Sequence, residues 1–378
     1  MIIYVDISNL LYTSFITGIQ RVVREVLSRM QDDSEFELLA YDFSKDCFLL
    51  VDKQVFFDKL KKGVIDREKC ITNNEVKYTD LQDNSIFFDI DGVWHSTKNR
   101  GYLYPVLAQK GIKIINMIYD VIPITGPIFC HENTVMSFMV YFGAVIKYST
   151  LIIVNAQATK DHIIDIASEL NVEMPRCEVI KLGADFGSEK KQYVEGNASQ
   201  KTKKAISAGK YILMVGTIEP RKNHAYVLDA LDRNLSVNVI FAGRQGWNVD
   251  ELVERIESHK QNGKRLFWIN DASDDDIQEL YRNAYYVVFP TKDEGFGLPI
   301  IEAVTKGIPV IGSNIPVVKE LGEDYIQYID NTNPQELVDL INGDTELNRN
   351  SYLQKMRNFP QYTWDKCVGE IKQVIADC

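Results

Sequence analysis

The chain has few of the residues that hold metals or cross-link small domains. Six cysteines and five histidines are spread over 378 residues, and no two cysteines form a C-x-x-C pair. Only Cys130 and His131 are neighbours, and no second pair lies at zinc-ligand spacing, which argues against a structural zinc site. Scattered cysteines in a chain long enough to bury a full core are typical of a reducing compartment. We therefore expect a cytoplasmic protein with free thiols and no bound metal.

Long apolar runs and an excess of basic charge are also missing. No apolar run reaches the roughly 18–20 residues that a membrane helix needs. The opening residues 1–6 are typical of a strand rather than of a signal peptide. Lys and Arg number 42 against 53 Asp and Glu, which gives a net charge of −11. Nucleic-acid-binding proteins carry a basic surface, so we expect no nucleic-acid partner. An anionic small ligand would need cations that are placed locally.

Strand and helix patterns alternate along the whole chain. Apolar runs predict strands at 2–5, 36–40, 86–88, 113–118, 151–154, 211–215, 237–241, 265–269, 286–289 and 308–311. Helical spacing predicts helices from 18 to 30 and at 135–147, 158–170, 225–231, 250–259 and 275–282. Such alternation favours parallel sheets that helices cover on both faces.

A change in composition divides the chain. Residues 187–204 are rich in Lys, Ser, Gly and Gln and poor in large aliphatic residues, as in an exposed linker. We predict an α/β fold of two Rossmann-like domains with parallel sheets. The predicted parts are an N-terminal domain at 1–187, a linker at 188–208, a C-terminal domain at 209–360 and a final amphipathic helix at 361–378. In open α/β sheets, ligands lie beyond the carboxyl ends of the strands, so functional motifs are expected there.

The most informative motif follows the predicted strand at 286–289. It reads E-G-F-G-L-P-I-I-E and runs from Glu294 to Glu302. Gly295 and Gly297 allow a ligand to approach the main chain, and the proline suits the first turn of a helix. The amides at such a helix start lack partners within the helix, which makes a site for anions and hydroxyl groups.

The same motif carries two carboxylates. Glu294 precedes the predicted helix and Glu302 lies about one turn inside it, so both can point toward one ligand. Carboxylates accept hydrogen bonds from sugar hydroxyls. The structural alternative is a solvated loop acid and a partner of the helix dipole.

A second motif, V-G-T-I-E-P-R-K-N, follows the predicted strand at 211–215. Gly216 permits a tight turn. Arg221 and Lys222 place two cations at the head of the next helix, where they can neutralise a diphosphate. The alternative is a solvent-exposed basic helix start, which the helix dipole disfavours.

Weaker signals lie in the first half. T-G-I-Q-R at 17–21 is a glycine turn that opens a helix, and Y-D-V-I-P at 119–123 places Asp120 after a strand, where a helix cap is the alternative. Trp94 is suited to stacking on a sugar or to burial in the core. The D-I-D triplet at 89–91 resembles a cation site but is interpreted as the start of a loop.

One further stretch, V-F-F-D-K-L-K-K-G-V at 55–64, mixes aromatic and basic residues. Such a mixture suits contact with an anionic membrane that carries a lipid-linked acceptor. A solvated helix face is the alternative.

Together these motifs resemble glycosyltransferase family 4. The resemblance includes A-G-R-Q-G-W at 242–247, and it covers nearly the whole chain, most strongly in the second half. The opening Y-V-D-I-S-N-L at 4–10, with the motifs at 17–21 and 119–123, is similar to bacterial O-antigen and capsule mannosyltransferases of that family. The resemblance implies the GT-B fold, in which two Rossmann-like domains face each other across a cleft, and in which the C-terminal helix returns to the N-terminal domain.

The resemblance also implies roles for single residues. Glu302 would bind the nucleotide ribose, Glu294 would contact hydroxyls of the donor sugar, and Asp120 would sit beside the reacting sugar. The catalytic candidates are therefore Asp120 and Glu294. The residues implied in donor binding are Gly18, Gly216, Thr217, Arg221, Lys222, Gly295, Phe296, Gly297, Leu298 and Glu302.

Two positions depart from the family pattern. Thr217 stands where many members have Arg, so the phosphate cation is expected from Arg221. Tyr119 stands where many members have His, so the resemblance does not extend to a mechanism that needs that His. The family retains the anomeric configuration without a bound metal, by front-side attack with the leaving phosphate as base. Charge then develops on the leaving diphosphate, where cations and helix amides stabilise it.

We therefore expect a retaining, metal-independent hexosyltransferase without a cofactor. GDP-mannose is the first choice of donor, and the acceptor is a growing glycan or a lipid-linked oligosaccharide in surface polysaccharide synthesis. A UDP- or dTDP-sugar donor is the alternative within the family. A phosphorylase would need a pyridoxal-phosphate lysine, a dehydrogenase would need G-x-G-x-x-G, and a hinged sugar-binding protein would need a secretory leader. We expect a cytoplasmic location, with peripheral contact at the inner face of the membrane left open.

Overall fold

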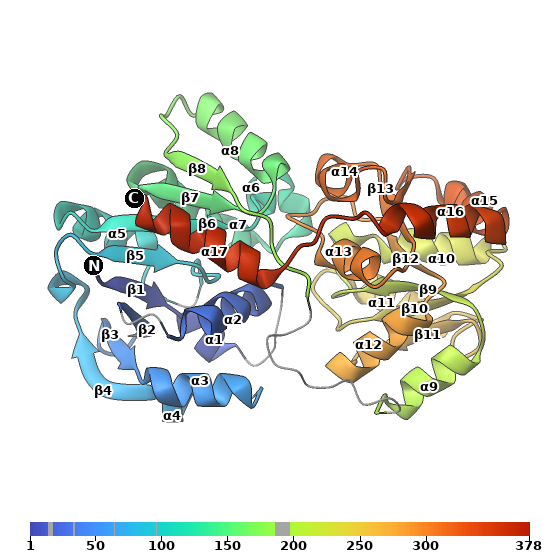
Figure 1. The fold of residues 1–378 in the computed structure, drawn as a ribbon, viewed down its shortest axis with the longest axis horizontal. Coiled ribbons are helices and arrows are strands. Elements are labelled where there is room, and N and C mark those ends of the chain that lie inside the picture. Colours follow the sequence, from blue (N-terminus) through green and yellow to red (C-terminus); the bar gives the residue numbers. More distant parts are fainter. Residues whose placement is uncertain (14–17, 33–34, 64, 96, 186–196) are drawn as a thin grey trace. The chain divides into compact units, whose positions relative to one another are not determined.

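Figure 1 shows the computed structural model of the chain. It describes residues 1–378 except 14–17, 33–34, 64, 96 and 186–196. The chain divides into two units. The first consists of Met1–Glu189 together with Tyr362–Cys378, and the second is Lys190–Gln361. The end of the chain therefore belongs to the same unit as its beginning.

The first unit is built on an eight-stranded sheet with the order β4-β3-β2-β1-β5-β6-β7-β8. Its strands are β1 (Ile3–Asp6), β2 (Phe36–Asp42), β3 (Cys47–Val51), β4 (Ile71–Val76), β5 (Ile86–Asp89), β6 (Lys113–Ile118), β7 (Leu151–Val154) and β8 (Arg176–Val179). The strands from β2 to β8 in this order are parallel. Since β2 and β5 flank β1 on its two sides, the order of the strands reverses at β1.

The expectation of wholly parallel sheets is wrong at one edge of this sheet. β3 pairs antiparallel with β2, and β4 pairs antiparallel with β3. β2 and β3 are joined by a short turn in which Asp46 has a left-handed backbone (φ 49°). A short turn can join only antiparallel neighbours, because parallel strands need a long crossover. The sequence pattern missed both strands, and also β8.

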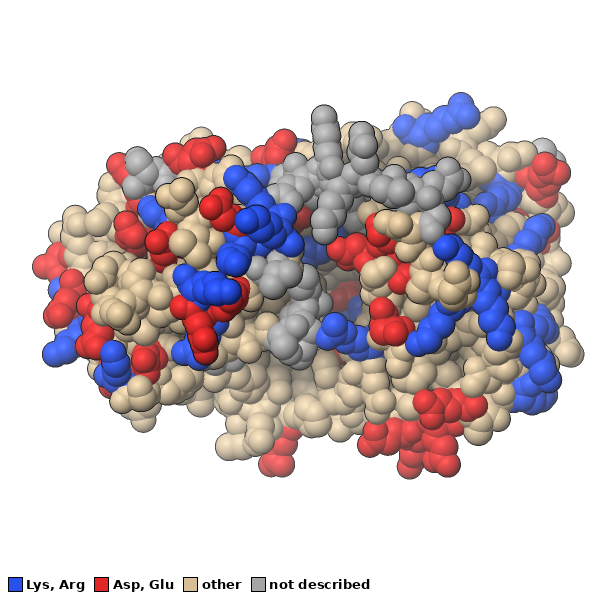
Figure 2. Space-filling view, turned by 90° about the horizontal axis from the view of Figure 1, so that it is seen from below, with Lys and Arg blue, Asp and Glu red and all other residues tan. Residues whose placement is uncertain are grey.

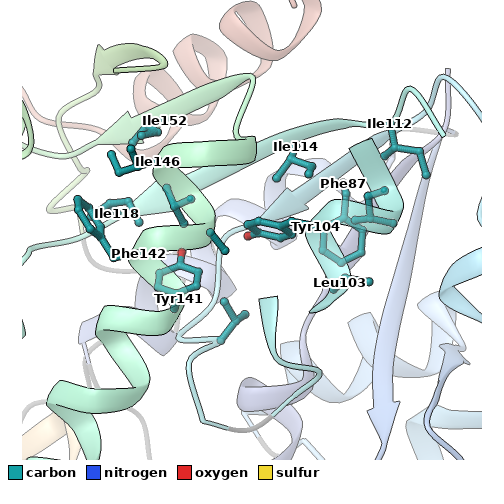
Figure 3. Close-up of a cluster of buried hydrophobic side chains, with 14 of the residues drawn as sticks. Phe87, Leu103, Tyr104, Ile112, Ile114, Ile118, Tyr141, Phe142, Ile146 and Ile152 are labelled. Atoms are coloured by element: carbon teal, nitrogen blue, oxygen red, sulfur yellow. The ribbon is translucent and has the colours of Figure 1, made fainter. Parts of the chain in front are cut away.

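Helices cover the first sheet. They are α1 (Ser8–Tyr12), α2 (Gly18–Met30), α3 (Lys53–Lys61), α4 (Arg67–Cys70), α5 (Arg100–Gln109), α6 (Ile122–Thr125), α7 (Glu132–Tyr148), α8 (Gln157–Glu169) and α17 (Trp364–Ala376), with short 3-10 turns η1 (Tyr78–Asp80) and η2 (Pro127–Phe129). Figure 3 shows the cluster in which α5 and α7 meet the sheet. Tyr104 and Tyr141 from these helices face Phe87 and Ile114 from the strands, and all four are buried.

The second unit holds a six-stranded sheet with the order β11-β10-β9-β12-β13-β14, in which every pairing is parallel. Its strands are β9 (Tyr211–Val215), β10 (Asn238–Ala242), β11 (Leu266–Ile269), β12 (Tyr286–Phe289), β13 (Val310–Ser313) and β14 (Gln327–Ile329). Its helices are α9 (Gln200–Ser207), α10 (His224–Asp232), α11 (Asp250–Ser258), α12 (Asp274–Asn283), α13 (Leu298–Thr305), α14 (Pro316–Gly322), α15 (Pro334–Asn342) and α16 (Glu346–Met356), with the 3-10 turn η3 (Pro220–Lys222).

The predicted linker at 188–208 differs from the structure in its described part. Residues 200–207 form α9 of the second unit, which packs against α12. Ser199 caps this helix by accepting a hydrogen bond from the amide of Thr202, and Thr202 and Ala205 are buried. The helix escaped prediction because so few of its positions are apolar. The earlier part of that stretch, up to residue 196, lies outside the described residues.

Acidic and basic side chains are mixed on the surface. On the face in Figure 2, blue Lys and Arg groups are interleaved with red Asp and Glu groups.

Candidate donor-binding site

The two strongest motifs follow neighbouring strands of the second sheet. From β9 the chain adds β10 and β11 on one side, and it then adds β12, β13 and β14 on the other side. The order of the strands therefore reverses between β9 and β12, and ligands of open α/β sheets bind at such a switch point. The loop at 216–223 follows β9 and the loop at 290–297 follows β12, so both motifs lie at this point.

Glycines hold the loop after β9 close to the loop after β10. The amide of Gly216 donates to the carbonyl of Ala242 (2.9 Å), and the amide of Gly246 donates to that of Ile218 (2.9 Å). A Cβ atom on Gly243 would lie 2.0 Å from the carbonyl oxygen of Gly216, so no other residue fits there. The glycines of the A-G-R-Q-G-W motif are therefore explained by structure, because they allow two backbone segments to approach closely.

A short 3-10 turn, η3, presents Arg221 and Lys222. The residue after it, Asn223, has a left-handed backbone (φ 63°), and its side-chain nitrogen Nδ2 donates to the carbonyls of Pro290 (3.1 Å) and Asn331 (2.8 Å). The amide of Lys292 donates to the carbonyl of Arg221 (2.7 Å). These bonds tie the loop after β9 to the loop after β12.

The tied loops form a cluster of two acids and two bases. The Glu294 carboxylate oxygen Oε2 contacts Arg221 Nη1 at 2.9 Å, and the same oxygen accepts a hydrogen bond from Lys222 Nζ. Arg221 Nη2 also contacts Glu219 Oε1 at 2.8 Å. None of the four side chains is more than 19% exposed. Lys222 Nζ also lies 4.9 Å from the centre of the Phe289 ring.

Burial and charge set the protonation of this cluster. Burial by itself would raise the pKa of Glu294, but Arg221 and Lys222 outweigh it and hold that pKa at about 2. Burial lowers the pKa of Lys222 and raises the pKa of Glu219. The result is a pre-arranged pair of cations at the switch point, which suits a ligand with two phosphate groups.

The E-G-F-G motif forms the start of α13 as predicted. Gly297 has a left-handed backbone (φ 104°), α13 begins at Leu298, and a proline lies in its first turn. No side-chain cap is present at this described helix start. Phe296 is buried beside it.

Glu302 lies inside α13 with its side chain buried. Its Oε2 accepts a hydrogen bond from the hydroxyl of Tyr281 in α12 at 2.8 Å. Glu294 and Glu302 therefore have different partners, one a pair of cations and the other a phenol. The spacing of the motif predicted that both glutamates accept hydrogen bonds from a ligand. It did not predict their partners within the protein.

The candidates in the first unit have structural partners of their own. Gly18 is the first residue of α2, whereas Thr17 of the same motif lies outside the described residues. Asp120 Oδ1 accepts a hydrogen bond from the amide of Ile122 (3.1 Å) at the start of α6. Tyr119 is buried, and its hydroxyl donates to the carbonyl of Ile90.

Two of the weaker signals are explained by packing. The Trp94 ring lies 5.3 Å from that of Phe138 and packs against the buried cluster. In the stretch at 55–64, Phe56, Phe57 and Leu60 of α3 are buried, and residue 64 lies outside the described part. The aromatic side chains that suggested membrane contact therefore belong to the core.

A buried ion network in the first unit was missed by the sequence analysis. Arg100 Nε and Nη2 contact the two carboxylate oxygens of Asp89 at 2.5 and 2.6 Å, and Nη2 also contacts Asp6 Oδ2 at 2.7 Å. All three side chains are fully buried. Asp6 and Asp89 end the adjacent strands β1 and β5. An acid at the end of an apolar strand was therefore the feature of the sequence that could have indicated these two residues. No feature of the sequence indicated Arg100.

The D-I-D triplet at 89–91 is used by this local structure. Asp89 binds Arg100, and Asp91 accepts hydrogen bonds from the amides of Leu10 (2.6 Å) and Gly92 (2.7 Å). Burial raises the pKa of Asp91 to about 6. Within the described part of the chain, no three His, Cys, Asp or Glu side chains are grouped to hold a metal ion. The helices described there are also too short or too polar to cross a membrane.

Comparison with known families gives one match. Residues 197–358 match the family model of the glycosyl transferases group 1. This segment contains both motifs of the switch point and covers most of the second unit.

Curated relatives extend the similarity over the first unit. The chain is 27% identical over 379 aligned positions to the serotype-specific mannosyltransferase WbdA of Escherichia coli, which covers 95% of this chain and 44% of that protein. It is 36% identical over 119 positions to the O-antigen chain mannosyltransferase B of Escherichia coli, at 30% and 31% coverage. The chain thus spans less than half the length of WbdA.

Solved structures share the whole fold. The Anabaena protein HepE, in complex with UDP and glucose, superposes with a TM-score of 0.72 at 12% identity over 100% of both chains. Sucrose-phosphate synthase from Thermosynechococcus elongatus gives 0.65 at 14% identity over 99% and 98%. The GT-B fold is confirmed by these structures, and the resemblance to glycosyltransferases of the O-antigen mannosyltransferase type is confirmed by the sequence relatives.

Proposed function

We propose that this chain is a retaining, metal-independent glycosyltransferase that moves mannose from GDP-mannose to a growing glycan or a lipid-linked oligosaccharide. The observation that carries the proposal is the buried cluster of Arg221, Lys222 and Glu294 at the switch point of the second sheet. The group 1 family match supports the reaction class, and the mannosyltransferase relatives support the sugar and a role in O-antigen synthesis. We further propose that the enzyme acts at the cytoplasmic face of a membrane, because a lipid-linked acceptor would be anchored in that membrane.

Arg221 and Lys222 are the cations of the cluster that face the charge of a nucleotide diphosphate. Arg221 and Lys222 bind the diphosphate, with the backbone at Gly216 and Thr217 close to it. Both cations use Oε2 of Glu294, so we assign Oε1 to a hydroxyl of the donor sugar. Glu294 in this role keeps the cations in place before the donor arrives.

The start of α13 supplies the remaining donor contacts. We assign the amides from Gly295 to Leu298 to the sugar and the phosphate next to it. Glu302, which accepts a hydrogen bond from Tyr281, is assigned to the ribose hydroxyls, the role that the family resemblance implies. Gly18 and Asp120, in the first unit, keep as proposals the roles that the family resemblance implies.

The proposed chemistry follows from these charges. Cleavage of the sugar–phosphate bond leaves negative charge on the diphosphate, which Arg221, Lys222 and the helix amides stabilise. The leaving phosphate takes the proton of the attacking hydroxyl on the same face of the sugar, and the configuration is retained. This sequence of events requires no second catalytic carboxylate opposite Glu294.

A UDP-sugar is the second candidate donor. The HepE structures, which share the fold, hold UDP with glucose and UDP-glucose. The donor test therefore compares nucleotides directly.

The first experiment measures the melting temperature with GDP, UDP, dTDP and ADP in the presence of EDTA. A nucleotide at about 100 times its Kd stabilises the folded state by about 2.7 kcal/mol. We expect GDP to raise the melting temperature, and Lys222→Met to abolish the shift. Lys260→Met, an exposed lysine of the same unit, is the matched control. A shift that needs a divalent cation, or that survives Lys222→Met, would contradict the proposed site.

A second measurement separates binding from transfer. Glu294→Gln keeps the size of the side chain but weakens the proposed bond to the donor sugar. We expect GDP still to bind, and mannose transfer to fall about 10- to 100-fold, as for loss of a hydrogen bond to a charged group. Glu257→Gln, on the exposed face of α11, is the control. Unchanged transfer in Glu294→Gln would remove Glu294 from the catalytic residues.

A further inference from the structure

Helix α7 presents an apolar outer face in addition to its buried inner face. Its inner side chains, including Tyr141, Phe142 and Ile146, lie in the core of the first unit (Figure 3). On the outside, Met136 is 61% exposed, Met139 is 56% exposed and Val140 is 51% exposed. A surface helix normally turns polar residues outward, so exposed apolar residues in a row indicate a contact surface.

The outer residues of α7 form one stripe with a charge at each end. Glu132 and Lys147 are the charged residues of this helix, and both are exposed. The residues at 132, 136, 139, 140, 143 and 147 follow helical spacing, so they share one face. We call these six residues the α7 stripe.

The α7 stripe is symmetric about its middle. The midpoint between Met139 and Val140 is also the midpoint between Met136 and Gly143, and between Glu132 and Lys147. Two copies of the stripe can be packed antiparallel, with a two-fold axis through this midpoint. Each residue then faces a residue of a different type on the other copy. An acid faces a base at both ends, and a long side chain faces a glycine on both sides of the middle.

We propose that two copies of this chain associate through the α7 stripe in a two-fold, antiparallel dimer. A two-fold interface brings the same patch of both copies together, and the patch must be self-complementary. The α7 stripe meets this condition in charge, because Glu132 of one copy faces Lys147 of the other.

The stripe also meets this condition in shape. A Cβ atom built on Gly143 would have nothing within 4 Å, so the surface above this glycine is open. In the antiparallel pairing this space receives Met136 of the second copy, whose flexible thioether adapts to irregular gaps.

The neighbouring surface enlarges the apolar contact. α5 packs beside α7, and Val140 lies next to Gly101 in the first turn of α5. Tyr102, which follows Gly101 on α5, is 73% exposed. Aromatic residues and methionine are enriched in protein interfaces.

The charges of the stripe favour a second copy over a membrane. A surface that binds anionic lipid usually carries several Lys or Arg at its edge. The α7 stripe carries one acid and one base and has no net charge. Its ends instead match each other, which a lipid surface does not require.

A charge exchange tests the pairing by sedimentation equilibrium of the full chain. Either single variant, Glu132→Lys or Lys147→Glu, places like charges opposite each other. This happens at both ends of the interface, so each dimer contains two repulsive pairs. Each single variant should weaken association about tenfold, the scale of a few surface ion pairs. The double variant Glu132→Lys with Lys147→Glu should restore the wild-type dissociation constant, because the pairs re-form with opposite signs.

A second variant tests the apolar middle. Met139→Glu with Val140→Glu places four carboxylates together at the axis and should give a monomer with unchanged circular dichroism. Ile164→Glu, at an exposed apolar position on α8 (43%), should leave the dimer intact. A monomeric wild type, or a double charge exchange that stays as weak as the single variants, would overturn the proposal. Binding of wild type but not of Met139→Glu with Val140→Glu to phosphatidylglycerol vesicles, with both proteins monomeric, would assign the stripe to a membrane and overturn it as well.

Discussion

His224 is a buried base next to the proposed donor site. It begins α10, its side chain is 1% exposed, and neither ring nitrogen has a hydrogen-bond partner among the described residues. Its ring lies 4.9 Å from that of Phe241, edge to face. Burial, together with the charge of Lys222, lowers the pKa of His224 to about 3. The imidazole is therefore neutral in the folded protein at any pH near neutrality.

This lowered pKa predicts a pH-dependent stability. The unfolded chain binds a proton at His224 near pH 6.5, which the folded chain does not take up until about pH 3. The contribution of His224 to the free energy of unfolding therefore falls as pH falls from about 6.5 toward 3, by at most about 1.4 kcal/mol per pH unit. Denaturant unfolding of the second unit at a series of pH values measures this slope.

His224→Leu isolates the effect of this one residue. The variant has no imidazole, so the difference between wild type and variant should grow as pH falls below about 6.5. Asp91 acts in the opposite direction, because its raised pKa favours the folded state below about pH 6, but it is present in both proteins. Near neutral pH the leucine variant should be as stable as wild type or more stable, since an unpaired buried polar group is removed. A constant difference across this pH range would show that the pKa of His224 is the same in the folded and unfolded chain.

The residues of the site were partly predictable from the sequence. Arg221, Lys222 and Glu294 stand out because cations, glycines and acids follow apolar strands in two short motifs. Their mutual ion pairs did not follow, since Lys222 and Glu294 are 72 positions apart and meet only through the order of the strands. The pair of Arg100 and Asp6, 94 positions apart, escaped for the same reason.

At the scale of elements, the start of α13 depends on the left-handed backbone of Gly297 (φ 104°). A Cβ atom there would strain the backbone and approach Ile300 Cδ1 to 3.2 Å. We expect Gly297→Ala to lower the free energy of unfolding by about 1–2 kcal/mol, the cost of the left-handed region for a residue with a Cβ. It should also weaken nucleotide binding, because the donor amides belong to this turn.

A glycine in a regular helix provides the control. Gly369 lies in α17, and a Cβ atom there would have nothing within 4 Å. Gly369→Ala should therefore raise the free energy of unfolding by about 0.5–1 kcal/mol. Equal effects of the two variants in thermal unfolding would show that the left-handed turn is not required.

Elements with a strong apolar pattern were predicted to the residue. The strands at 113–118, 151–154, 211–215 and 286–289 coincide with β6, β7, β9 and β12, none of which is an edge strand. Three of the missed strands, β4, β8 and β14, lie at the edges of their sheets, whereas β3 is buried between β2 and β4. β4 is mostly exposed and β14 has three residues, so neither carries a run of buried positions that a pattern can reveal.

At the scale of the molecule, the chain order does not coincide with the units. The last residues fold onto the first unit, where Trp364 begins α17 with a fully buried side chain. The amide of Trp364 donates to Asp185 Oδ1 at 2.7 Å, and Arg29 of α2 contacts Asp365 at 2.6 Å. The amphipathic pattern of 361–378 predicts a helix, but its docking place came only from the family resemblance. A pattern of apolar positions predicts which face of a helix is buried. It does not predict which part of the protein that face packs against.

This arrangement predicts that a change near the C-terminus destabilises the first unit and spares the second. Trp364→Ala should lower the stability of the first unit by about 3–5 kcal/mol, the cost of emptying a buried aromatic site. In calorimetry, its transition should therefore fall by about 10 °C. The transition that a bound nucleotide raises should stay in place, because the proposed donor residues lie in the second unit. Ile341→Ala, in the core of the second unit, is the matched variant and should move only the nucleotide-sensitive transition. A shift of that transition by Trp364→Ala, with the other unchanged, would place α17 in the second unit.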